Sequence, residues 1–214
     1  MKTATKLFTE EEKERIRGAV AREEARSSGE IVPMVVDRSG HYMEFVLTGA
    51  ILFTFLVAVV VTFFWHRATA PQILLVEFSI FWVSFSLIRR IRPIWSWLIP
   101  DSLKDQAVRR RAEEAFYEHR LHETRDKTGI LIFLSLLEHR VELLADVGIQ
   151  RRVPQERWDR LVSEIALQVK AGRSFEALTN AIESCGQLLT EHFPKTPSDF
   201  DELPDHLRIE EKER

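Results

Sequence analysis

The sequence predicts a small mixed β-sheet covered by amphipathic helices, with a two-helix transmembrane hairpin inserted into it. The chain of 214 residues is long enough for one domain plus extra elements. Residues 43–100 are almost entirely apolar, whereas the segments before and after them hold nearly all of the charge. Those flanking segments combine helical periodicity with short runs of Ile and Val, as mixed α/β domains do.

This pattern predicts a division of the chain into four parts. Residues 1–40 and 101–194 are expected to form one soluble domain, because a strand before the hairpin should pair with strands after it. Residues 43–100 hold the hairpin, with helices at 45–65 and 73–88, and an interfacial stretch rich in Trp and Pro. The charged tail, 195–214, is expected to be largely disordered, or a short helix at most, because it has little apolar surface to bury.

The first soluble segment predicts a helix followed by a strand. Thr9 and Glu12 form a capping-box pattern, so a helix should begin there and run to about Ala25. Residues 30–36 are rich in Ile and Val and predict a strand. Because proline has no N–H to donate, Pro33 predicts an edge position or a bulge in that strand.

The apolar stretch is long enough to cross a bilayer twice. Residues 45–65 carry no charge and would be about 31 Å long as a helix, the thickness of a hydrocarbon core. Residues 73–88 contain Glu77, which is either a carboxylate near the interface or a functional proton or ion site. The short link between the runs implies antiparallel helices, so both flanking segments lie on one side.

The distribution of positive charge predicts which side that is. Short cytoplasmic loops carry an excess of Lys and Arg. Five such residues flank the hairpin and one, Arg67, lies in its link, so both termini and the soluble domain are predicted to be cytoplasmic; the five are Arg38, Arg89, Arg90, Arg92 and Lys104. The N-terminal residues lack the apolar core of a signal peptide, so the first hydrophobic helix is expected to target the membrane.

The segment after the hairpin predicts the rest of the domain. A helix is expected over 102–124, and a near-continuous apolar strand over 130–136 that is buried on both faces. Residues 141–145 should pair with that strand in antiparallel fashion. Apolar residues at helical spacing then predict two amphipathic helices, over 155–170 and from Ser174 until Pro194 stops the second.

Several motifs of these elements resemble the TPM domain family, above all its membrane-bound bacterial members. The matching residues are GEIV at 29–32, TRDKTGILIFLSL at 124–136, EHRVELLADVGI at 138–149, Trp158, Gly172-Arg173, Ala181-Ile182 and HFP at 192–194. The resemblance covers 9–40 and 101–194. It implies an α/β sandwich and a bacterial inner membrane. Some members of the family resemble acid phosphatases, some bind calcium, and others are assembly or modulator modules of membrane complexes.

Two sets of residues are candidate metal ligands. His119 and His122 would share a face of the predicted helix, and Glu118 or Glu123 would complete three zinc ligands; a solvated helix end is the alternative. Asp37 and Asp146 each follow a predicted strand, so their carboxylates could meet over the sheet edge. Two carboxylates supply few of the 6–8 oxygens that calcium takes.

Composition and motifs favour an interaction module over an enzyme. The net charge of −3 argues against nucleic acid as a partner. The sequence has neither a Gly-rich phosphate loop nor a Gly-flanked nucleophile, and the one cysteine, Cys185, lies on an apolar stripe. We therefore expect an assembly or modulatory module that contacts the lipid bilayer and a membrane-protein partner. The alternatives are a phosphoester hydrolase using Asp37, Asp126 and Asp146, and a calcium or zinc sensor.

Overall fold

The computed structural model describes residues 3–64, 69–90, 99–196 and 203–210. The chain divides into two compact units, one of Met1–Ser39 with Lys104–Arg214 and the other of Gly40–Leu103. Most of the predicted interfacial stretch, residues 91–98, lies outside the described residues.

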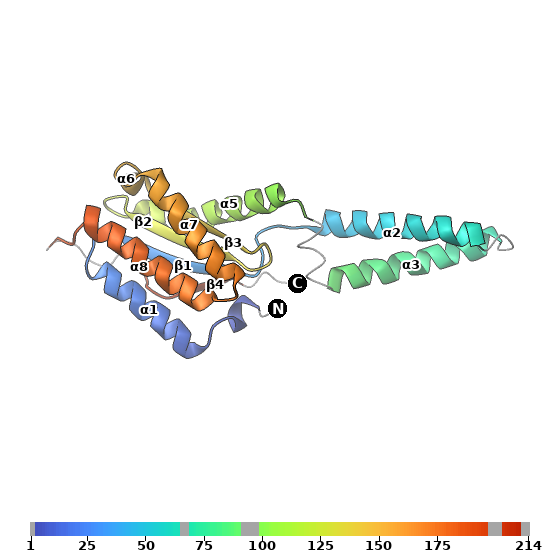
Figure 1. Cartoon of the computed structure of the whole chain (residues 1–214), viewed down its shortest axis with the longest axis horizontal. Coiled ribbons are helices and arrows are strands. Elements are labelled where there is room, and N and C mark those ends of the chain that lie inside the picture. Colours follow the sequence, from blue (N-terminus) through green and yellow to red (C-terminus); the bar gives the residue numbers. More distant parts are fainter. Residues whose placement is uncertain (1–2, 65–68, 91–98, 197–202, 211–214) are drawn as a thin grey trace. The chain divides into compact units, whose positions relative to one another are not determined.

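The first unit is built on a mixed four-stranded sheet (Figure 1). Its strands are β1 (Glu30–Val36), β2 (Gly129–Ser135), β3 (Arg140–Ala145) and β4 (Arg208–Glu210), in the order β3-β2-β1-β4. β1 is parallel to β2 and β4, whereas β2 and β3 form an antiparallel pair. A strand from before the hairpin therefore pairs with a strand from after it, as the sequence predicted.

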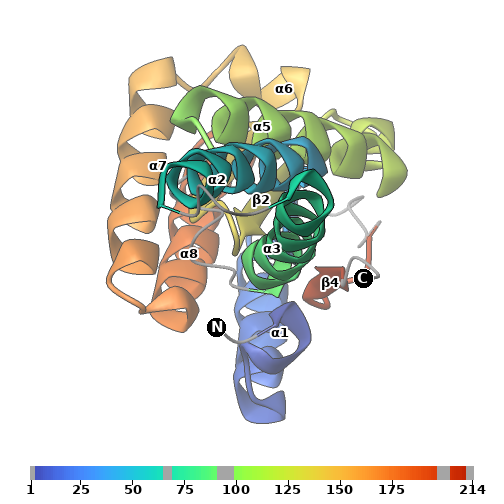
Figure 2. The same cartoon turned by 90° about the vertical axis from the view of Figure 1, so that its right-hand side faces the viewer.

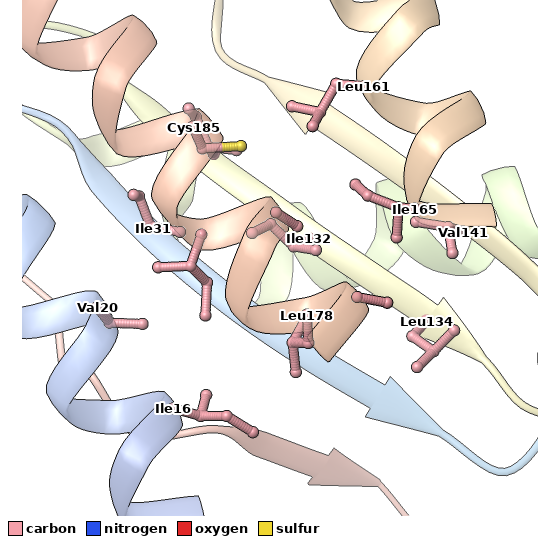
Figure 3. Close-up of a cluster of buried hydrophobic side chains, with 14 of the residues drawn as sticks. Ile16, Val20, Ile31, Ile132, Leu134, Val141, Leu161, Ile165, Leu178 and Cys185 are labelled. Atoms are coloured by element: carbon pink, nitrogen blue, oxygen red, sulfur yellow. The ribbon is translucent and has the colours of Figure 1, made fainter. Parts of the chain in front are cut away.

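Both faces of the sheet are covered by helices, which explains why β1 and β2 are apolar at nearly every position. One face packs against α1 (Glu10–Glu24), α7 (Gln155–Lys170) and α8 (Ser174–His192). Figure 3 shows side chains of these helices converging on Ile31, Ile132 and Leu134. The opposite face packs against α5 (Asp101–Glu118) through Met34 and Phe133. α7 and α8 run side by side in Figures 1 and 2.

The N-terminal segment follows its predicted local structure at the start of α1. Thr9 and Glu12 form the capping box, in which the Thr9 N–H donates to Glu12 Oε2 over 2.7 Å. Pro33 was predicted to mark an edge position or a bulge, but β1 lies between β2 and β4 and its register with β2 is unbroken. The backbone N–H groups of β1 point in turn toward β2 and toward β4. The N–H of Glu30 donates to the Thr128 carbonyl on the β2 side, and that of Asp37 donates to the Glu210 carbonyl on the β4 side. Pro33 therefore faces the β4 side, where pairing begins only at Met34.

The tail differs from the sequence prediction. Residues 195–214 were expected to be largely disordered, but Arg208–Glu210 forms β4 and pairs with Met34–Val36. Leu207 is buried, and Ile209 packs against the larger core cluster. The prediction was wrong because a strand this short is specified by one or two apolar contacts and by backbone hydrogen bonds to β1. Average polarity over the whole tail conceals those contacts.

Short elements complete this unit: the 3-10 helices η1 (Ala4–Lys6) and η2 (Leu121–Glu123), and the single-turn helix α6 (Val147–Gln150). The second unit contains α2 (Met43–Phe64) and α3 (Ala70–Arg90), which form an antiparallel pair (Figure 1). Both helices are long and apolar enough to cross a membrane. Most of their large apolar side chains point outward.

Candidate functional site

The predicted histidine pair does not form, because the helix that should carry it ends early. α5 stops at Glu118, and Arg120 takes a left-handed conformation with φ of 59° before η2 begins. The prediction that His119 and His122 share a helical face is therefore wrong. His119 Nδ1 lies 2.9 Å from a guanidinium nitrogen of Arg208 on β4. The His122 ring instead packs against Tyr117, with ring centroids 4.9 Å apart.

The surroundings of His119 are unfavourable for a cation. Burial and the neighbouring positive charge of Arg208 lower the pKa of His119 below its ordinary value. Arg111 forms ion pairs with Glu118 and with Glu210, and so joins α5 to β4. Among the described residues, no group of three or more His, Cys, Asp or Glu side chains is arranged to hold a metal ion.

The two predicted aspartates lie at opposite ends of the sheet. Asp37 follows β1, whereas Asp146 follows β3, which runs in the opposite direction. The prediction that their carboxylates meet over one edge is therefore wrong. Asp37 accepts a hydrogen bond of 2.6 Å from the Ala4 N–H, and Asp146 is the N-cap of α6. Asp126 is exposed in the turn that precedes β2, at the Asp146 end.

A buried polar cluster at the ends of β1 and β2 was missed by the sequence analysis. Glu138 accepts a hydrogen bond of 3.0 Å from the Ser39 N–H and another from the Ser135 hydroxyl. The Ser39 hydroxyl in turn donates to Ser135 Oγ over 2.9 Å. All three side chains are at most 3% exposed, so the cluster fixes the backbone rather than meeting a substrate. The only local signal was a Ser ending an apolar strand with Glu three residues later.

Cys185 is not a nucleophile in this fold. Its side chain is fully buried in the larger core cluster, and burial raises the pKa of its thiol to about 12. A thiol in that state is protonated and inert at neutral pH. The buried Trp158 likewise belongs to the core, as its place on an apolar stripe predicted.

The comparison with known protein families decides what this arrangement is. Residues 97–188 match the family model of the TPM domain. Over these residues the chain carries a TPM domain. The match runs through α5, β2, β3, α6 and α7 and into α8, which hold most of the segments whose residues resembled the family. GEIV at 29–32 and HFP at 192–194 lie outside the matched residues. A comparison with curated protein sequences found no match.

A solved structure shares the fold of this TPM-domain chain. It is the NMR structure of the BA42 protein from the psychrophilic bacterium Bizionia argentinensis, with a TM-score of 0.60. The two chains are 21% identical, and the match covers 95% of each. At that identity the likeness concerns the α/β fold and carries no statement about activity.

The remaining candidate surface of the TPM-domain chain is its apolar hairpin. In the most apolar windows of α2 and α3, only 11% and 6% of the residues are buried. Phe55 and Phe63 on α2 are 68% and 78% exposed, and Leu75 on α3 is 68% exposed. Core helices of soluble proteins bury such side chains. A contiguous exposed apolar surface of this kind is typical of a membrane or protein contact.

Proposed function

We propose that this chain is a membrane protein in which the α2–α3 hairpin anchors the TPM domain at a bilayer, where the domain serves as an interaction or assembly module. The observation that carries the proposal is the outward-facing apolar surface of both helices. Each Leu, Ile, Phe or Val near the centre of a transmembrane helix favours insertion by about 0.3–0.6 kcal/mol. The many such residues of α2 and α3 together outweigh one glutamate.

The position of the hairpin in the chain supports an anchoring role. It enters the sequence after β1 and leaves it before α5, so two connections join it to the TPM domain. Positive residues concentrate on the flanks rather than in the link, which supports a cytoplasmic location of the domain. The resemblance to membrane-bound bacterial proteins supports a bacterial inner membrane. The interaction role gains its support from the groove on the hairpin described below.

Membrane integration is tested by alkaline carbonate washing of membranes from cells that express the full chain. An integral protein should stay in the pellet until detergent is added, because carbonate removes only peripherally bound proteins. A variant with Leu56→Arg and Val59→Arg, two changes in the middle of α2, is the matched control and should shift to the soluble or aggregated fraction. A wild-type chain released by carbonate would overturn the anchoring proposal.

Orientation and interaction need two separate measurements. In a Cys185→Ser background, the exposed Glu11 is replaced by Cys and probed with an impermeant thiol reagent. Labelling is expected in inverted vesicles and not in intact cells; the reverse result would place the domain outside. For the interaction role, purification in mild detergent should yield a second membrane protein in constant ratio. A chain that always purifies alone would contradict that part of the proposal.

A further inference from the structure

The hairpin carries a groove that contains its one acidic group away from the helix ends. The groove has a volume of about 670 Å³ and lies between α2 and α3. It is lined by Thr54 from α2 and by Leu74, Glu77 and Phe78 from α3. Glu77 is half-buried, whereas Leu74 and Phe78 on the rim are 65% and 64% exposed.

The Glu77 carboxylate lies at membrane depth. It is seven residues after Ala70, the first residue of α3, and therefore roughly 10 Å along the helix. An ionisable group at that depth is costly unless another group pairs with it, and it usually faces protein or water rather than lipid. Glu77 accordingly calls for a hydrogen-bond donor or a positive charge.

The described helices of the hairpin, α2 and α3, do not provide that group. Neither α2 nor α3 contains Lys or His, and Arg89 and Arg90 are roughly 18 Å further along α3 than Glu77. The Thr54 hydroxyl donates to the Ala50 carbonyl over 2.8 Å and is therefore already committed. Among the described residues, no hydrogen bond or ion pair reaches the Glu77 carboxylate.

Charge complementarity decides what kind of molecule fits the groove. Its lining is apolar except for the Thr54 hydroxyl and the Glu77 carboxylate, and only the carboxylate is charged, so it matches an apolar helix that presents one cationic donor. A second copy of this chain is a poor match, since its groove would bring another carboxylate against Glu77. Free lipid is also a poor match, because acyl chains offer no donor at this depth.

We propose that the α2–α3 groove binds a transmembrane helix of another membrane protein that presents a Lys or Arg side chain to Glu77. This inference rests on the proposed function, because it requires the hairpin to lie in a bilayer. It goes further by naming the contact surface and the chemistry of the partner. The ion pair supplies specificity, while Leu74 and Phe78 provide van der Waals contact with the incoming helix.

The test uses the purified full chain in vesicles of phosphatidylcholine and phosphatidylglycerol. The probe is a synthetic polyleucine transmembrane peptide with a dansyl group and a single Lys at the depth of Glu77. Binding is measured by quenching of the tryptophan fluorescence of the chain. A peptide with Leu in place of that Lys is the reference. The Lys peptide should bind about tenfold more tightly than the Leu peptide.

Two variants connect that preference to the groove. Glu77→Gln should abolish the tenfold difference, whereas Glu44→Gln, the same change in the first turn of α2, should retain it. Glu77→Lys should reverse the preference, so that a Glu peptide binds more tightly than the Lys peptide. Restored binding in this charge swap excludes misfolding as the reason for any loss in Glu77→Gln.

The outcomes separate this inference from the anchoring proposal. A chain that does not float with the vesicles after an alkaline wash would overturn both. A chain that floats but binds the Lys and Leu peptides equally would overturn only the groove proposal. One more outcome would overturn the groove proposal: quenching between differently labelled copies of the chain that is lost in the Glu77→Gln variant. The groove would then bind a second copy.

Discussion

Phe133 and Phe63 are the same residue type in opposite settings. Phe133 on β2 is fully buried between the sheet and α5, whereas Phe63 on α2 is 78% exposed. The contrast extends to both units, because the TPM domain gathers its apolar side chains inside and the hairpin displays them outside. Hydrophobicity alone therefore does not identify a core. The periodicity of polar residues does, since α7 and α8 have a polar face and α2 does not.

The largest effect expected from this contrast concerns the two phenylalanines. Phe133→Ala should lower the free energy of unfolding of the TPM domain by about 3–5 kcal/mol, because it leaves a cavity in a packed core. Phe63→Ala should change it by less than about 0.5 kcal/mol. Urea unfolding of the full chain in detergent micelles, followed by circular dichroism, measures both. Equal effects would show that the two settings are not distinct.

The second prediction asks whether the tail belongs to the core. Leu207→Ala should destabilise the TPM domain by about 2 kcal/mol, because Leu207 is 8% exposed and packs beside β4. Leu167 on α7 is 68% exposed, so Leu167→Ala is the matched control and should be nearly neutral. The shift of the urea midpoint compares the two variants. A neutral Leu207→Ala would mean that the tail does not stabilise the domain.

The third prediction concerns the buried cluster beside the hairpin connection. Glu138→Gln replaces a charged acceptor of the Ser39 N–H and the Ser135 hydroxyl with a neutral one. Stability should fall by about 1–2 kcal/mol, and hydrogen exchange of the Ser39 amide should accelerate. Glu183→Gln on the exposed face of α8 provides the control. Unchanged exchange at Ser39 would argue against the cluster as a backbone anchor.

The smallest predicted effect is a pH dependence from His119. Its pKa is lowered in the folded state, so the unfolded chain binds the proton more readily. The contribution of His119 to the free energy of unfolding should therefore be present above pH 6.5, the ordinary pKa of histidine, and be lost as the pH falls below it. His119→Gln should reduce the slope of the urea midpoint between pH 7 and pH 5. The variant His206→Gln, at an exposed site, is the control. If both variants gave the same slope, the assignment to His119 would be contradicted.

Local patterns in the sequence predicted most of the fold. The capping box at Thr9, the stripes of α7 and α8 and the run after Gly129 each depend on neighbours within one element. The pairing of β1 with β2 also followed, because an apolar strand before the hairpin had to be covered by something after it. β4 was missed because its stability comes from β1, a partner distant in the sequence.

The candidate sites were harder to predict because they depend on where elements end and in which direction they run. His119 and His122 separate because the chain turns left-handed at Arg120. Asp37 and Asp146 separate because β3 reverses direction relative to β1. The Glu138 cluster forms only when two strands distant in sequence end side by side. Spacing within one segment contains none of this information.

The place of the hairpin between two paired strands also sets an order on biosynthesis. β1 leaves the ribosome roughly 90 residues before β2, its parallel neighbour, which at 5–20 residues per second is a delay of roughly 5–20 s. During that interval a strand destined to be buried on both faces has no sheet to join, while the hairpin emerges and, under the anchoring proposal, would enter the bilayer. We therefore expect insertion to precede folding, with nascent β1 dependent on chaperones until β2 is made.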